Sequence, residues 1–392
     1  MMSPDIYFIL LFFMLLVFPK FLQRFGVPSA ITSFCVGLAS GPIFDVVQSN
    51  QIINILSTLG IVTLFLFAGL EADLPKLTKG KSILFQHILI FLTILCIATG
   101  IFCRVFEFDV RSSALIAIAL LTPSAGFILD SLRSLHLGTE QQFWIKSKTI
   151  SAEIVALGVL FVVLQSQRWT GLVLSTIILI AMIYLLPLIF KGVARWIIPY
   201  APKSEFTFLI MVAISCALIT KKLGVYYLVG SFIVGISVQR FRENLPAFSS
   251  EKMLDAIELF SSFFIPFYFF NAGLGIPREA FSWQAVALGL FLLTIFIPLR
   301  IFSITFHRWW VLKESLSDAK KIGIRILPTF VFTLVLVDIL KNKFDAPAVV
   351  LGALVLYTVI NTIFPSLILK EKPLEFENQH LTDIEVEPTP RT

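Results

Sequence analysis

Residues 26–37 read GVPSAITSFCVG, and residues 224–235 read GVYYLVGSFIVG. Six positions recur at a constant offset, so that Gly26, Val27, Ser33, Phe34, Val36 and Gly37 match Gly224, Val225, Ser231, Phe232, Val234 and Gly235. A second pair follows in step: LFLFAGL ends at Leu70 and FYFFNAGL ends at Leu274. Each stretch is also followed by an apolar run that contains a proline, Pro123 in one case and Pro328 in the other. The chain is therefore predicted to consist of two related halves.

The composition assigns both halves to a membrane. Of 392 residues, 57% are hydrophobic and 14% are charged, and the mean hydropathy is +0.90. Soluble domains carry about 25% charged residues, so an ordinary soluble domain is excluded. The net charge of +6 is spread along the chain without a basic run, which indicates loop positioning and not nucleic-acid binding. The four cysteines show no metal or disulfide spacing, so neither a metal cluster nor a disulfide is expected.

Apolar runs predict an all-α polytopic membrane fold with about thirteen transmembrane helices. The first run has no basic n-region and no small-residue cleavage site, so it is interpreted as a retained span and not as a signal peptide. Residues 1–370 are predicted to form one membrane transport domain, and the polar, acid-rich residues 371–392 a disordered cytoplasmic tail. The predicted spans are 5–20, 27–43, 51–71, 82–104, 112–133, 141–166, 170–190, 205–221, 225–240, 253–275, 281–304, 319–340 and 345–369.

The distribution of basic residues predicts the orientation. With the N-terminus outside, the inner loops carry 21 Lys and Arg residues and the outer loops carry 8. Basic residues are enriched in cytoplasmic loops. We therefore expect an N-terminus outside, a cytoplasmic C-terminus, an odd number of spans and residence in the cell inner membrane.

The two mid-span prolines predict interrupted helices. Pro123 lies in LLTPSAGFILD, and Pro328 occupies a matching place in the other half. Proline removes a backbone hydrogen bond, so carbonyl groups and the hydroxyls of Thr122 and Ser124 become available as hard oxygen ligands for a monovalent cation. Paired broken helices in repeated halves are typical of secondary transporters, whose site lies where the breaks meet. The alternative is two simple proline kinks, which are common in membrane helices.

Ionisable residues within the predicted spans are few, and Glu153 is the strongest candidate among them. Burying a carboxylate at mid-membrane costs about 3 kcal/mol or more, and such residues are usually functional. A carboxylate there can hold a proton or a cation but not both, which is the basis of exchange. Arg300 and Arg325 are candidate charge-balancing residues; the alternatives are an ion pair that only anchors Glu153, or arginines that snorkel to the interface.

The remaining ionisable residues are weaker candidates. Glu258 is either a second acid or a residue at a helix start, and the sequence does not decide between these. Asp338 is expected at a membrane interface, because it lies near a span end. The four histidines (His87, His136, His307 and His380) have no metal-ligand spacing, and no proton-relay role is predicted for them.

With these motifs, the chain resembles the monovalent cation:proton antiporters of the second branch, which include bacterial sodium/proton exchangers and the transport domain of glutathione-gated potassium-efflux systems. The resemblance covers about residues 5–370. LGIVTLFLFAGLEADL is similar to the family's third-span signature, SFIVGISV with FIPFYFFNAGL to its second-half signature, and TPSAG to its broken-helix peptide. Arg300 falls where the family carries Lys or Arg. The resemblance implies an inverted-repeat fold with a mobile core domain, which holds the broken helices and Glu153, and a dimerising scaffold. The first, second, eighth and ninth spans would supply most of the scaffold, and the protein would be a homodimer.

The chain departs from the family at two places. The family carries Asp-Asp, Asn-Asp or Gln-Asp where this chain has Ala152 and Glu153, so the first polar residue is absent and the acid is longer. The family's Arg–Gly pair in the second broken helix is Arg325 and Ile326 here. The first departure leaves cation selectivity open and is compatible with a member that has lost ordinary exchange.

From these residues we expect a secondary antiporter, not an enzyme, that exchanges protons for Na⁺ or K⁺ by alternating access. Glu153 would bind both ions in turn, with Thr122, Ser124 and Ser151 as oxygen ligands and no cofactor. One titrating acid beside a fixed Arg predicts electroneutral exchange. Two alternatives remain open: a sodium-coupled organic-anion carrier on a similar inverted-repeat fold, and a non-transporting membrane sensor or partner subunit.

Overall fold

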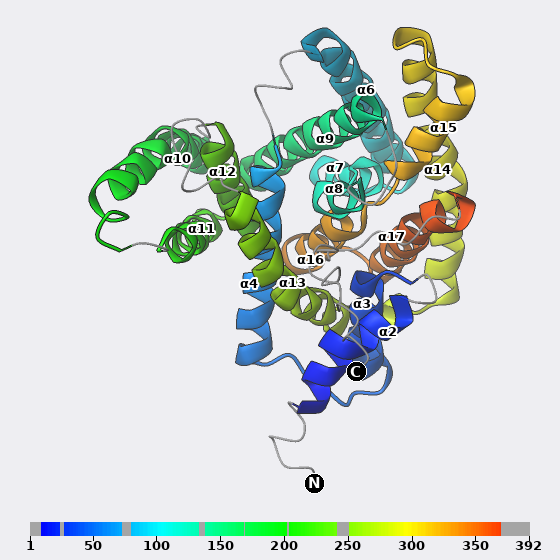
Figure 1. Cartoon of the computed structure of the whole chain (residues 1–392). Helices are drawn as coiled ribbons and strands as arrows, with labels where there is room; N and C mark the ends of the chain where they lie inside the picture. The colour runs from blue at the N-terminus through cyan, green and yellow to red at the C-terminus, as the bar shows by residue number, and fades with distance from the viewer. Residues whose placement is uncertain are drawn as a thin grey trace, which may run out of the picture.

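The computed structural model describes residues 9–23, 27–72, 80–132, 138–167, 169–201, 204–240 and 251–369. Within these ranges every regular element is a helix, as the sequence predicts (Figure 1). The start of the first predicted span and the predicted tail 371–392 lie outside the described residues.

The first half of the chain begins with two short elements and continues with longer helices. They are η1 (Phe13–Val17), α2 (Phe18–Gln23), α3 (Ser29–Leu38), η2 (Ala39–Ile43), α4 (Gln51–Leu70), α6 (Lys81–Val105), α7 (Val110–Leu121), α8 (Ala125–Leu132) and α9 (Thr139–Gln165). The second half comprises α10 (Trp169–Trp196), α11 (Glu205–Lys222), α12 (Tyr227–Arg240), α13 (Glu251–Leu274), η6 (Arg278–Ala280), α14 (Trp283–Val311), α15 (Leu316–Arg325), α16 (Phe330–Phe344) and α17 (Ala348–Leu369).

Fewer than the predicted thirteen helices are both long enough and apolar enough to cross a membrane. In the described part of the chain, eight helices are long and apolar enough to cross a membrane, and nine if the bent pair α15–α16 is one span. Three further apolar helices, Ile9–Leu22, Ser29–Ile43 and Tyr227–Gln239, are shorter. The count of thirteen is therefore not confirmed.

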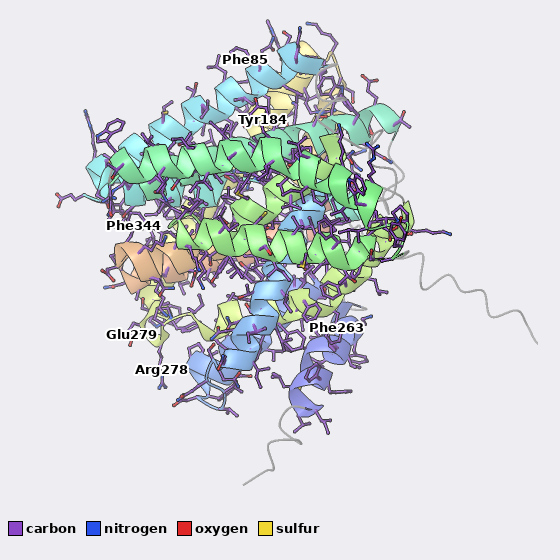
Figure 2. All side chains as sticks on the ribbon, turned by 90° about the vertical axis from the view of Figure 1, so that its left-hand side faces the viewer. Phe85, Tyr184, Phe263, Arg278, Glu279 and Phe344 are labelled. Carbon is purple, nitrogen blue, oxygen red and sulfur yellow. The ribbon has the colours of Figure 1, made fainter. Side chains whose placement is uncertain are left out.

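Large apolar side chains cover the outside of this bundle. Phe85 on α6 is 66% exposed and Tyr184 on α10 is 72% exposed, and Figure 2 shows both among side chains that point away from the helices. Contiguous exposed apolar surface on this scale marks contact with a membrane or a partner. The surface thus agrees with the apolar composition in requiring a lipid environment.

The two halves present equivalent elements in the same order, with α3 matched to α12, α4 to α13 and α6 to α14. The interrupted pair α7–α8 matches α15–α16, and α9 matches α17. Contacts divide the helices into two groups: α4 packs on α12 and α13, α3 on α13 and α12 on α11, whereas α14 packs on α15 and α17, and α16 on α7 and α17. Figure 1 shows α7 and α8 surrounded by α9, α16 and α17, with α10 and α11 beyond α12.

The repeated glycines found in the sequence meet one another across the halves. A Cβ atom on Gly235 of α12 would lie 2.8 Å from the backbone of Gly69 on α4. In the equivalent contact, a Cβ on Gly273 of α13 would lie 3.1 Å from the backbone of Gly37 on α3. Only glycine permits backbones to approach this closely, as in small-residue packing between membrane helices. The repeat therefore encodes two equivalent helix crossings, each joining one half to the other.

Candidate functional site

The first interruption lies where the sequence predicts it. α7 ends at Leu121, and Thr122 is extended with φ −79° and ψ 118°. A residue before proline is driven out of the helical region by the Pro ring, and Pro123 has no N–H to continue the ladder. The chain resumes as α8 at Ala125.

The second interruption is sharper. α15 ends at Arg325 and α16 begins at Phe330, and their axes differ by 43°. Pro328 lies in the middle of this break, and Leu327 before it is non-helical for the same steric reason as Thr122. Both prolines predicted to break helices therefore do so.

The two breaks cross and bond to each other. The N–H of Ser124 donates to the carbonyl of Pro328 over 2.8 Å. At the end of α7, the carbonyl of Ala119 accepts from Thr333 Oγ1 on α16 at 2.7 Å, and that of Leu120 accepts from the Tyr357 hydroxyl on α17 at 2.9 Å. Side chains from the second half thus replace the backbone partners that the first break removes.

Glu153 lies directly beside this crossing. It is on α9, only 1% exposed, and its carboxylate accepts a hydrogen bond from the N–H of Ala125, the first residue of α8. The positive end of the α8 dipole therefore faces the acid. Among the described residues, the second carboxylate oxygen, Oε2, has no hydrogen-bond partner, and neither has the buried hydroxyl of Thr122 three residues before Ala125. Buried polar atoms are normally satisfied, so these two oxygens are unused binding capacity.

Arg300 binds the backbone of the second break and not the Glu153 carboxylate. From α14, its guanidinium donates to the carbonyls of Leu327 at 2.6 Å and Ile326 at 2.9 Å, and it also bonds to the Tyr357 hydroxyl. The fixed positive charge compensates the negative end of α15. Arg300 therefore does not form the direct ion pair with Glu153 that one interpretation of the sequence proposed.

The other predicted residues are distributed around and away from the crossing. The Ser151 hydroxyl donates to the carbonyl of Lys148 on its own helix at 3.0 Å. Arg325 is the last residue of α15 and half-buried. Glu258 is buried on α13, which packs on α3 and α4, and Asp338 bonds to the Tyr226 hydroxyl at 2.7 Å in a separate cavity.

Sequence reasoning missed the contribution of α17. Asn361 donates to the carbonyl of Leu327 at 2.7 Å and to Thr329 Oγ1 at 3.2 Å, and Thr329 bonds to Thr358 at 2.9 Å. These groups hold the second break in place together with Arg300. An available signal was the amide of Asn361 within a predicted apolar span that carries no charged residue from 346 to 369.

A polar cavity lies between the two groups of helices, near the start of α4 and the ends of α13 and α16. Its volume is about 420 Å³, and its lining includes Asn54, Tyr226, Tyr268, Leu334 and Asp338.

One turn before Leu334, the Phe330 ring packs on Phe34 and Phe269 at centroid distances of 5.5 and 5.1 Å, and all three residues are fully buried. At the opposite end of α4 from this cavity, Lys146 on α9 forms an ion pair with Glu71, which follows α4, at 3.0 Å.

Comparison with known proteins agrees with this architecture. The family described as "Sodium/hydrogen exchanger, transmembrane" matches residues 8–371. The chain is 22% identical over 272 residues to the Na(+)/H(+)-K(+) antiporter GerN of Bacillus cereus, covering 67% of this chain and 68% of GerN. It is 24% identical over 279 residues to a Na(+)/H(+) antiporter of Enterococcus hirae, covering 67% and 70%.

A solved structure shows the same fold. The sodium proton antiporter MjNhaP1 from Methanocaldococcus jannaschii, at pH 8, superposes with a TM-score of 0.68 at 15% identity, covering 93% of this chain and 95% of that protein. The family match includes every described residue, and so all the helices that carry the crossing. This chain is accordingly an integral membrane protein of the sodium/hydrogen exchanger family.

Proposed function

We propose that this protein is a secondary antiporter that exchanges H⁺ for Na⁺, with K⁺ as a second candidate cation. The observation that carries the proposal is the buried Glu153 carboxylate beside two crossing helix breaks, whose Oε2 has no hydrogen-bond partner in the part of the chain that the structure describes. An acid in this position cannot stay charged without a counter-ion, so either a proton or a bare cation must neutralise it. The relatives named as sodium/proton antiporters support sodium as the first cation.

The cation ligands are hard oxygens from the first break. Glu153 supplies the charge, and the unpartnered Thr122 hydroxyl supplies a neutral oxygen. We include Ser124 and Ser151 as further ligands, since the lone pairs of a hydroxyl stay available while its proton is donated. Oxygen-only coordination suits an alkali cation. The departure at Ala152 removes one side-chain ligand, which makes Thr122 more important here.

Alternating access would come from movement of α6–α9 with α14–α17, the core, against α3, α4 and α11–α13, the scaffold. Contacts between these groups lie at both ends. Lys146–Glu71 joins them at one end. At the other end, Tyr226–Asp338 and the bond from Lys341 to the carbonyl of Gly275 join them. Opening either end requires breaking one set while the other is kept. A homodimer through the scaffold remains part of this proposal.

The exchange is proposed to be electroneutral. Glu153 is the acid at the crossing, and Arg300 stays charged at all relevant pH values while bonded to the carbonyls of the second break. One proton therefore leaves for each monovalent cation that binds. An organic-anion carrier is not favoured, because Arg300, one of the two arginines that could bind an organic carboxylate, is already bonded to backbone carbonyls. A non-transporting subunit is not favoured, because the relatives are named as antiporters.

The test is reconstitution into proteoliposomes that contain a pH-sensitive dye. Adding Na⁺, K⁺ and Li⁺ in turn to acid-loaded vesicles should alkalinise the lumen in wild type, most strongly with Na⁺, and should have no effect with Glu153→Gln. The rate should not change with a potassium–valinomycin voltage in the Na⁺ assay. Cation-driven proton flux that survives in Glu153→Gln would overturn the assignment of the site, and a voltage-dependent rate would overturn the one-for-one scheme.

A further inference from the structure

The last turns of α14 carry a row of exposed aromatic side chains, which we call the aromatic stripe: Phe302, Phe306, Trp309 and Trp310. They recur at helical spacing, and Phe302 and Trp310 are 65% and 60% exposed. The Phe306 ring contacts those of Phe302 and Trp310 at centroid distances of 5.7 and 6.0 Å. From Phe302 to Trp310 the helix rises roughly 12 Å, and one leaflet of a bilayer has about 15 Å of hydrocarbon. The aromatic stripe is therefore long enough to lie along the acyl chains of one leaflet.

Three exposed lysines follow the aromatic stripe at the turn from α14 into α15. Lys313 lies in the connection with φ 57°, and its Nζ is 5.4 Å from the centroid of the Trp310 ring. Lys320 and Lys321 are on the exposed face of α15, which packs on α14. A Cβ on Gly323 of α15 would lie 3.2 Å from a carbonyl oxygen of α14, so α15 runs back along α14 and places both lysines beside its last turns. We call the three lysines the basic corner.

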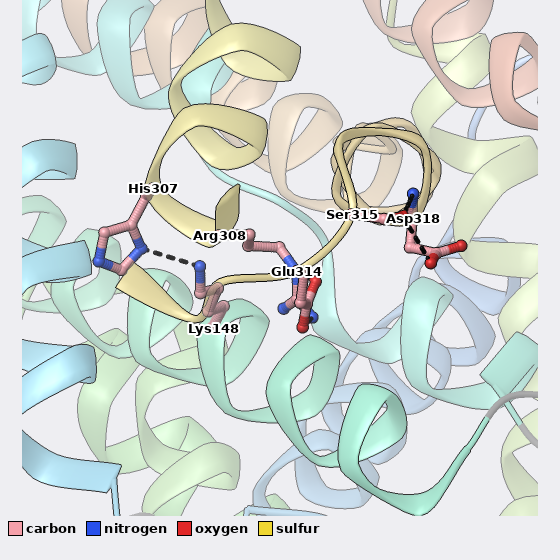
Figure 3. Close-up of polar contacts among 6 residues, drawn as sticks. All are labelled: Lys148, His307, Arg308, Glu314, Ser315 and Asp318. Atoms are coloured by element: carbon pink, nitrogen blue, oxygen red, sulfur yellow. Dashed lines mark hydrogen bonds and ion pairs between the residues drawn. The ribbon is translucent and has the colours of Figure 1, made fainter. Parts of the chain in front are cut away.

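The two acids in the connection and in the first turn of α15 already have partners. Glu314 accepts a hydrogen bond from Arg308 Nε at 2.8 Å and pairs with the same guanidinium through its other oxygen. Figure 3 shows Glu314 turned toward Arg308, with Lys148 beside it bonded to His307. Asp318 accepts from the hydroxyl of the N-cap serine at 2.7 Å, and it faces the positive end of the α15 dipole. Neither acid is therefore directed to the basic corner, whose positive charge is left for an external anion.

The order of these groups along α14 matches the order of the parts of a phospholipid. α14 is long and apolar enough to span a membrane, and the stripe continues its exposed apolar face toward the connection. Tryptophan rings favour the level of the headgroups, and lysines near a membrane surface attract anionic headgroups. Figure 1 shows α14 and α15 on the side of the molecule away from α10 and α11, at the outer edge of the helices. A soluble anion would use the lysines but would leave the aromatic stripe without a partner.

We propose that the basic corner and the aromatic stripe together bind one anionic phospholipid, with the lysines around its phosphate and the stripe along its acyl chains. This surface is separate from the ion site at Glu153, and the inference does not depend on the proposed function. α15 leads directly into the second break, whose carbonyls bind Arg300. The lipid is thus attached to the helix pair that carries the crossing.

The test is quenching of tryptophan fluorescence by brominated lipids, because bromine quenches on contact. The full chain contains six tryptophans, so the signal of the site is the difference between wild type and Trp309→Phe/Trp310→Phe in phosphatidylcholine bilayers. Brominated phosphatidylglycerol should replace phosphatidylcholine at the site with a preference of about tenfold or more, since each lysine close to an anionic surface contributes about fivefold. The triple variant Lys313→Gln/Lys320→Gln/Lys321→Gln should have a preference of about one.

Two controls separate charge at the site from charge elsewhere. Arginine at the three positions of the basic corner keeps the charge and should keep the preference. Arg104→Gln/Lys222→Gln/Arg278→Gln removes three exposed positive charges elsewhere on the surface and should leave the preference unchanged. Raising the salt concentration from about 0.1 to 1 M shortens the Debye length from about 10 to 3 Å, and should weaken the preference in wild type.

The inference would be overturned by equal quenching with the two lipids in wild type, or by an undiminished preference in the triple glutamine variant. Absence of quenching by either lipid would also overturn it, since protein and not lipid would then cover the aromatic stripe. Displacement of the brominated lipid by inorganic phosphate would identify a free anion as the occupant and would overturn the assignment to a lipid.

Discussion

Arg300 and Asn361 both donate to one carbonyl, that of Leu327 in the second break, at 2.6 and 2.7 Å. This arrangement predicts that their removal is not additive. Replacing either residue leaves Leu327 with one donor, whereas replacing both leaves a buried carbonyl with none. A buried acceptor without a partner costs about 1–3 kcal/mol.

The magnitudes follow from the bonds lost. Arg300→Met removes the bond to Tyr357 and two charge-assisted bonds to the carbonyls of Leu327 and Ile326. Each of the two carbonyl bonds is worth about 1.5–3 kcal/mol, so we expect a loss of about 3 kcal/mol or more. Asn361→Leu removes neutral bonds and should cost about 1–2 kcal/mol. The double variant should exceed the sum of the singles by about 1 kcal/mol, which is within the range of coupling for residues in one network.

The assay is the free energy of unfolding in detergent, measured for wild type, both single variants and the double variant. Arg104→Met is a suitable control, because Arg104 is exposed at the end of α6 and its loss should change stability by less than about 0.5 kcal/mol. Additivity within about 0.3 kcal/mol would refute the shared-acceptor reasoning. An Arg300→Met variant as stable as wild type would refute the structural role of Arg300 altogether.

Three further predictions address other parts of the molecule. Glu153→Gln should abolish cation-driven proton flux while the protein stays folded, because an amide keeps the shape of the acid but cannot release a proton; flux assays and thermal melting check both points. Gly235→Ala should destabilise the protein by about 1–3 kcal/mol, because its Cβ would press on the Leu66 carbonyl, and a melting temperature equal to that of wild type would contradict this contact. Burial raises the pKa of Asp109, but hydrogen bonds from Ser112 outweigh it and leave the pKa below its ordinary value. The stability from this helix cap, about 1 kcal/mol, should thus be full at neutral pH, disappear as the pH falls through that lowered pKa, and be absent at all pH values in Asp109→Ala, as pH-dependent melting would show.

Much of the architecture could be predicted because the relevant rules are local. The prolines break helices through their own covalent structure, so Pro123 and Pro328 located both interruptions from sequence alone. Glu153 stood out because a carboxylate within an apolar run is expensive, and it does lie beside the crossing. The repeated glycines indicated two related halves, although the sequence did not show that they pack against each other.

The parts that could not be predicted depend on contacts between distant segments. Nothing in the sequence pairs Arg300 with carbonyls 26 and 27 positions later, or Lys148 with His307. The count of thirteen spans is also not confirmed, since the runs around residues 29–43 and 227–239 form helices shorter than a bilayer is thick. Such helices remain acceptable where neighbours, and not lipid, satisfy their ends.

The glycine contacts that join the two halves have a consequence for biosynthesis. α3 finds its close partner in α13, and α4 finds its own in α12, so neither half contains the surface that its glycine-lined helices need. When only about the first 200 residues have been synthesised and inserted, α3 and α4 are in the bilayer without α13 and α12. The two halves must therefore pack against each other late, after the second half has also been inserted.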